Sequence, residues 1–167
     1  MIRSFAGKTP RVAPDAFVSE AAYVVGDVEI GAGSSVWPGA VVRGDVGPIR
    51  IGCNTHVEDN AVLHSATELD IGDDVMIGHG AVVHCRRIGK GVLIANAATV
   101  LDDAEIGDES VVAAGAVVVP RTVALARSFI AGVPAQVRPM TQEQAARRNW
   151  GSDFYRNLAQ RYREAGL

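Results

Sequence analysis

Three histidines, His64, His79 and His84, lie close together in the middle of this sequence. Imidazole nitrogens are common metal ligands, and three histidines that leave a fourth position open form the ligand set of a zinc centre that activates water. The spacing of His79 and His84, five residues apart, suits neither a helix face nor one side of a strand. The elements that carry these histidines therefore have to be identified before the three can be joined in one site.

An aliphatic residue recurs every six positions through most of the chain, and only three steps depart from six. No amphipathic helix has this period. The aliphatic positions are Val12, Val18, Val24, Ile30, Val36, Val42, Ile51, Val57, Leu63, Ile71, Ile77, Val83, Ile88, Ile94, Val100, Ile106, Val112 and Val118. A small or β-branched residue follows most of them by four positions, as Ala40 and Thr55 do, and we expect this second set to point inward. Glycine commonly follows directly, as at Gly52, where we expect it to supply permissive backbone for frequent turns.

The repeat resembles that of the hexapeptide-repeat family, and the resemblance covers about residues 12–119. It implies an all-β fold, a left-handed parallel β-helix shaped as a triangular prism with three hexads per coil. Residues 129–140, FIAGVPAQVRPM, look like the closing segment of this superfamily. We therefore predict a β-helix domain over residues 1–140 and a C-terminal α-helix over residues 141–167.

The predicted helix opens with Thr141 and Gln144, whose spacing is that of a capping box. We expect its apolar face to pack along the prism or onto a neighbouring chain, and Gly151 marks a break within it. The residues of that face, at steps of four, are Ala146, Trp150, Phe154, Leu158 and Tyr162.

On a three-sided prism, every third hexad begins the same side. Arg43, His64 and His84 each follow a residue that begins one side, so they point outward in one column. A second column leaves the prism near another edge. Its members are Pro38, Asp59, His79 and Asn96.

His79 cannot easily reach the other two histidines within one chain. Three prisms packed about a threefold axis would bring the second column of one chain against the first column of the next. We therefore predict metal sites between subunits, with His64 and His84 from one subunit and His79 from its neighbour. His56 fits neither column and is expected at the surface or at an interface.

Three segments resemble, in order, the motifs of the γ-class carbonic anhydrases: RGD at residues 43–45, VEDNAVLH at 57–64 and HGAVVH at 79–84. The resemblance implies a homotrimer with Zn²⁺, or in some members Fe²⁺ or Co²⁺, at each interface. It implies reversible hydration of carbon dioxide to bicarbonate by a metal-bound hydroxide. Arg43 would pair with Asp59 across the interface, with Asp45 in the same polar network.

The expected catalytic residues depart in part from the family pattern. Glu58 stands where the family has a glutamine that binds the metal-bound water, so its charge would change the acidity of that water. Val46 replaces an acidic residue, and the acidic loop is reduced to residues 65–70 with Glu68 as the nearby proton carrier, which predicts slow proton export. Tyr155 resembles a tyrosine that homologues place over the site, with helix packing as the alternative. Asn96 would line the pocket.

Composition excludes several classes of partner. The net charge of −3 and a pI near 5.8 leave no basic surface for nucleic acid. The longest apolar run, residues 111–119, is too short to cross a membrane, and the first residues do not resemble a signal peptide. Two cysteines, Cys53 and Cys85, are too few for a disulfide framework. We expect a cytoplasmic protein in which both thiols are buried or half-buried.

Two other functions remain open from the sequence. The hexapeptide superfamily is rich in acyltransferases that use coenzyme A, and the same metal centre could act as an acyl-CoA thioesterase. A non-catalytic, metal-stabilised trimeric scaffold would also use the three histidines, Arg43 and Asp59. Fold similarity decides none of these alternatives.

Overall fold

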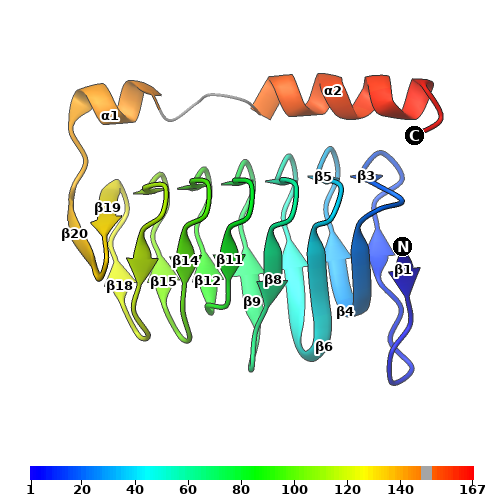
Figure 1. The fold of residues 1–167 in the computed structure, drawn as a ribbon, viewed down its shortest axis with the longest axis horizontal. Coiled ribbons are helices and arrows are strands. Elements are labelled where there is room, and N and C mark those ends of the chain that lie inside the picture. The colour runs from blue at the N-terminus through cyan, green and yellow to red at the C-terminus, as the bar shows by residue number, and fades with distance from the viewer. Residues whose placement is uncertain (148–151) are drawn as a thin grey trace.

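The structure, a computed structural model, describes residues 1–147 and 152–167. Short strands follow one another around a parallel β-solenoid of about seven turns, and a helical segment at the C-terminal end lies along it (Figure 1). This architecture is that of a left-handed β-helix and confirms the fold class predicted from the repeat.

Two sheets make up the solenoid in the described part of the chain, and their strands pair in parallel apart from β19 with β20. The eight-stranded sheet consists of β3 (Phe17–Val18), β5 (Ser35–Val36), β7 (His56–Val57), β10 (Met76–Ile77), β13 (Leu93–Ile94), β16 (Val111–Val112), β19 (Ser128–Gly132) and β20 (Ala135–Pro139). The twelve-stranded sheet consists of β1 (Ile2–Arg3), β2 (Arg11–Val12), β4 (Tyr23–Ile30), β6 (Val41–Ile51), β8 (Val62–His64), β9 (Leu69–Ile71), β11 (Val82–Val83), β12 (Arg87–Ile88), β14 (Thr99–Val100), β15 (Glu105–Ile106), β17 (Val117–Val118) and β18 (Val123–Ala124).

The larger sheet supplies two of the three faces of the prism. Strand β6 pairs with β8 through residues 41–43 and with β9 through residues 49–51. Its two halves therefore belong to different faces, and the chain bends around an edge of the prism between them. The eight-stranded sheet supplies the third face.

The core is built from the two predicted sets of inward residues. Every member of the aliphatic series from Val24 to Val118 is at most 3% exposed, whereas Val12 and Val18 in the first coil are partly buried. The second set is buried as well, with Ala40 and Thr55 fully covered. Each buried valine, leucine or isoleucine contributes about 1.5–3 kcal/mol relative to an exposed one. The repeat therefore predicted the core correctly.

The glycines that follow the aliphatic residues have a different role from the one expected. None of them has a positive φ. A Cβ added to Gly52 would instead lie 2.6 Å from the carbonyl carbon of Gly72 in the next coil. Left-handed backbone occurs two positions later in the hexad, at residues such as Asn54 and Gly115. The glycines that follow the aliphatic residues, such as Gly52, are therefore required because neighbouring coils approach closely there.

Two helices follow the solenoid, α1 (Gln142–Arg147) and α2 (Ser152–Glu164). The capping box is present, because the Gln144 N–H donates to Thr141 Oγ1 and the Thr141 N–H donates to Gln144 Oε1. Helix α1 lies beside the last coils, and α2 extends back over β3 and β5, so both chain ends lie at the same end of the solenoid (Figure 1). No helix in the described residues is long and apolar enough to span a bilayer.

The apolar face of the C-terminal segment differs from the predicted one. Leu158 and Tyr162 pack against Phe17 and Trp37 of the prism, as expected for a helix that packs along it. Phe154 is 61% exposed in the single chain, so it does not pack along the prism, and its packing onto a neighbouring chain stays a prediction. Trp150 and Gly151 lie outside the described residues, as does the side chain of Ala146.

The two cysteines differ in exposure, so the expectation of a buried thiol holds for Cys85 and is wrong for Cys53. Burial raises the pKa of the Cys85 thiol to about 12. Because thiolates react and thiols do not, Ellman's reagent should modify Cys53 rapidly in the folded protein and Cys85 only after unfolding. We expect Cys53→Ser to remove the fast phase and Cys85→Ser to leave it intact. A fast phase in Cys53→Ser would contradict this assignment.

Candidate metal centre

His64 and His84 lie side by side on one face of the prism. His64 ends β8 and His84 directly follows β11, and the parallel register of these strands stacks the two residues. Arg43 lies opposite His64 in β6, which confirms the predicted column. The Nδ1 atom of His64 lies 3.1 Å from the Nε2 atom of His84, and the ring centroids are 5.1 Å apart.

A carboxylate lies behind each of these two rings. Asp45 Oδ1 is 3.2 Å from His64 Nε2, and Asp102 Oδ1 is 3.1 Å from His84 Nδ1. The other nitrogens of the two rings are the ones that face each other. Asp102 was not predicted from the sequence. The one feature of the sequence that could have indicated it is its position in the turn one coil after His84.

Arg43 pairs within its own chain with Asp45, with Nη1 2.9 Å from Oδ2. Its Nη2 atom lies 3.3 Å from His64 Nε2. Burial and then the positive charge of Arg43 lower the pKa of His64, which favours the neutral imidazole that can bind a metal. The expected pairing of Arg43 with Asp59 of a neighbouring subunit stays a prediction.

His79 lies on the other column, and the structure does not bring it to the histidine pair. Its Nε2 is 3.0 Å from Glu58 Oε2 and its Nδ1 is 3.1 Å from Asp59 Oδ2. Its backbone N–H donates to Asn96 Oδ1 at 3.2 Å, so Asn96 is beside it as expected. Residues 1–147 and 152–167 of one chain contain no group of three or more His, Cys, Asp or Glu side chains that could hold a metal ion.

Glu58 is 4% exposed, although its position on the strand points it out of the prism. Helix α2 covers it, and the hydroxyl of Tyr155 donates a hydrogen bond to its carboxylate. Burial raises the pKa of Glu58, while the charge of His79 and the bond from Tyr155 oppose the rise. Burial and the nearby charge of Glu58 also raise the pKa of Tyr155, so the phenol keeps its proton and acts as a donor.

Tyr155 packs in an aromatic cluster, which is the alternative expected for it, and it also reaches Glu58; its role over a metal site stays a prediction. Its ring lies 5.5 Å from that of Trp37 and is stacked 5.7 Å from that of His56. His56 is fully buried, with Nδ1 2.8 Å from Ser35 Oγ. The expectation that His56 lies at the surface or at an interface was therefore wrong, since the ring of Tyr155 stacks over it.

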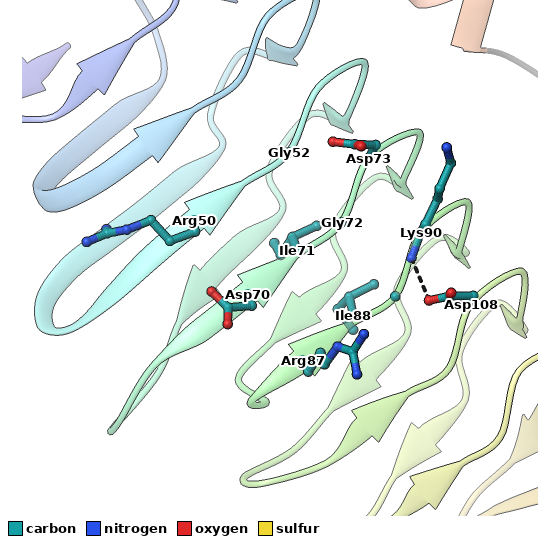
Figure 2. Close-up of a pocket in the computed structure, with 11 residues that line it drawn as sticks. Arg50, Gly52, Asp70, Ile71, Gly72, Asp73, Arg87, Ile88, Lys90 and Asp108 are labelled. Carbon is teal, nitrogen blue, oxygen red and sulfur yellow. Dashed lines mark hydrogen bonds between the residues drawn. The ribbon is translucent and has the colours of Figure 1, made fainter.

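A groove of about 310 Å³ lies on another part of the prism, over the turns that follow β9 and β12 (Figure 2). Its lining includes the glycines of three successive coils, and none of its lining residues is a predicted site residue. The cations around it are Arg50, Arg87 and Lys90, and the carboxylates are Asp70, Asp73 and Asp108. Because these charges are equal in number, the groove has no net charge to select a charged ligand.

Comparisons with known proteins agree with the fold. Residues 87–120 match the family model of the bacterial transferase hexapeptide (six repeats). The chain is 39% identical over 162 residues to γ-carbonic anhydrase 1, mitochondrial, of Arabidopsis thaliana, which covers 92% of this chain and 59% of that relative. It is 34% identical over 163 residues to the carnitine operon protein CaiE of Salmonella agona, which covers 96% of this chain and 82% of that protein.

A solved structure has nearly the same extent as this chain. The crystal structure of a hexapeptide transferase family protein from Anaplasma phagocytophilum superposes with a TM-score of 0.91 at 33% identity, covering 96% of this chain and 97% of that one. The chain therefore belongs to the hexapeptide-repeat family, and its sequence is similar to that of γ-carbonic anhydrases. The chain spans 59% of the length of the plant relative. Its relatives are named for different functions, so the family alone does not define its activity.

Proposed function

We propose that this chain is a metal-dependent γ-carbonic anhydrase that reversibly hydrates carbon dioxide at sites between the subunits of a homotrimer. The observation that carries the proposal is the histidine pair, in which His64 Nδ1 faces His84 Nε2 at 3.1 Å with a carboxylate behind each ring. The likeness to a plant γ-carbonic anhydrase supports it.

The donor set fits a divalent metal. Zinc binds imidazole nitrogens at about 2.0–2.1 Å, so tetrahedral coordination would separate two ligand nitrogens by roughly 3.3 Å, close to the spacing of the pair. Carboxylates on the outer nitrogens are the usual support for metal-bound histidines. The ligand set suits Zn²⁺, with Fe²⁺ or Co²⁺ as alternatives.

The face that carries the histidine pair also supports a second copy of the chain as the partner. An outward, mostly apolar column runs beside Arg43, His64 and His84 along the strand register. Contiguous apolar surface of this kind marks an association site. The column consists of Tyr23, Val41, Val62, Val82, Thr99 and Val117, all partly or largely exposed in the single chain.

In the proposed site, His64 and His84 of one subunit and His79 of the next would hold the metal. The metal, when bound, supplies acidification of a coordinated water. Asp59 would hold the outer nitrogen of His79, and Glu58, fixed by Tyr155, would accept a hydrogen bond from water. The candidate proton carrier Glu68 is paired with Arg86 at 3.3 Å, in keeping with slow proton export.

The first test is metal content per chain on anaerobically purified protein, with stopped-flow hydration of carbon dioxide on the same sample. We expect about one metal ion per chain and measurable hydration in the parent, and loss of hydration in His79→Ala. Bound metal without hydration in the parent would refute the anhydrase activity. Absence of bound metal would refute the site itself.

Acyl-thioester chemistry is the second candidate. It is favoured by the match to the structure of a hexapeptide transferase family protein. His79, flanked by Glu58 and Asp59, has the surroundings of a general base. Release of free thiol from short-chain acyl-CoA esters, measured on the same sample, distinguishes this activity from hydration.

A further inference from the structure

We propose that Asp102 is a positioning residue that holds His84 in the orientation and tautomer required for metal binding. This inference rests on the proposed metal site and adds to it a residue that neither column contains. Asp102 follows β14, one coil beyond His84, and its Oδ1 lies 3.1 Å from His84 Nδ1.

The backbone on both sides fixes this geometry. The His84 N–H donates to the carbonyl of Val100 at 2.8 Å, and the carbonyl of Asp102 accepts from the Arg121 N–H at 2.8 Å. Asp102 is therefore tied to the coil of His84 and to the following coil. The side chain of Asp102 is 53% exposed, and one oxygen of its carboxylate lies beside the imidazole.

The chemistry of the contact determines which nitrogen of His84 is available. An ionised carboxylate accepts hydrogen bonds and has none to donate, so Asp102 favours the tautomer in which His84 Nδ1 carries the hydrogen and donates it. The lone pair is then on Nε2, the atom that faces His64. Without this acceptor, both tautomers and a rotated ring become accessible.

Asp102 differs from Asp45, the carboxylate behind the other histidine. Asp45 is shared between His64 and the guanidinium of Arg43. Among the described residues, His84 is the sole ion-pairing partner recorded for Asp102. Its carboxylate is therefore available entirely to orient His84.

The test compares Asp102→Ala, Asp102→Asn and the matched control Asp103→Ala, using Co²⁺ affinity measured by competition with a chelator. Asp103 is the adjacent exposed carboxylate, and its left-handed backbone (φ 56°) is one that Ala97 of this chain also adopts. We expect Asp102→Ala to bind Co²⁺ about 10–100-fold more weakly than the parent, as is usual for loss of such a support. Asp102→Asn keeps an oxygen acceptor but not the charge, so its Co²⁺ affinity should lie between those of Asp102→Ala and the parent. The Co²⁺ affinity of Asp103→Ala should match that of the parent.

Two further measurements keep a positioning role separate from a structural one. The thermal midpoint and the trimer on size exclusion should be unchanged in Asp102→Ala, while the visible absorption of bound Co²⁺ should change. Equal Co²⁺ affinity in Asp102→Ala and parent would overturn the inference and leave the proposed function standing. Weaker binding accompanied by dissociation of the trimer would also overturn it, and a parent that binds no Co²⁺ would refute both.

Discussion

Chains carrying His79→Ala and chains carrying His84→Ala, each inactive alone, should regain about a quarter of the parent hydration rate when they are mixed, unfolded and refolded together. The reason is that each proposed site takes His64 and His84 from one subunit and His79 from the next. In a random equal mixture, about one interface in four combines an intact pair with an intact His79. Stopped-flow hydration per trimer measures the recovery.

The matched control is a mixture of His64→Ala and His84→Ala chains. These substitutions damage the same side of the interface, so every site keeps one defective ligand and the mixture should stay inactive. Recovery in this control would place His64 and His84 of one site in different chains, contrary to the proposed site. Failure of the first mixture, with mixed trimers verified by mass spectrometry, would contradict a shared site.

A large loss of stability is expected for Gly52→Ala. The added Cβ would meet backbone of the next coil, at 2.6 Å from the carbonyl carbon of Gly72 and 2.7 Å from the nitrogen of Asp73. Overpacking of this kind costs about 1–3 kcal/mol, and the cost is at the upper end when backbone has to move. Urea unfolding at one fixed chain concentration, followed by circular dichroism, should show a clearly lower midpoint.

The control for this prediction is Gly115→Asn. Gly115 has a φ of 67° with open space where a Cβ would lie, and Asn54 and Asn60 already occupy the same place in other hexads with similar backbone. Asparagine tolerates this conformation, so the free energy of unfolding should change by less than about 0.5 kcal/mol. If the two variants unfold at the same midpoint, close packing between coils does not explain these glycines.

The features that the sequence predicted well are those that each hexad encodes for itself. The inward residues, the column of Arg43, His64 and His84, and the separation of His79 from the pair all follow from a period that repeats with little change. A register error at one coil would have moved every later residue to another face, so the long series also limits the error.

The features that the sequence did not predict depend on contacts outside the repeat. His56 and Glu58 are buried by α2, which lies far from them in the sequence. The hexad repeat does not predict where this helix packs against the coils. Asp102 is a single residue outside the repeated positions, and its proposed role depends on its contact with the ring of His84 one coil away. The role of the glycines that follow the aliphatic residues is set by the backbone of the next coil, which the local sequence does not describe.

The return of α2 to the first coils has a consequence for the chain during translation. Each coil packs mainly on the coil before it, so coils can stack one after another while the chain leaves the ribosome. The histidine pair is made before the later coils, whereas Tyr155 follows only after the last coil. A nascent chain therefore carries His64 and His84 together while Glu58 and His56 are still open to water, and release of the C-terminal segment is the step that closes them.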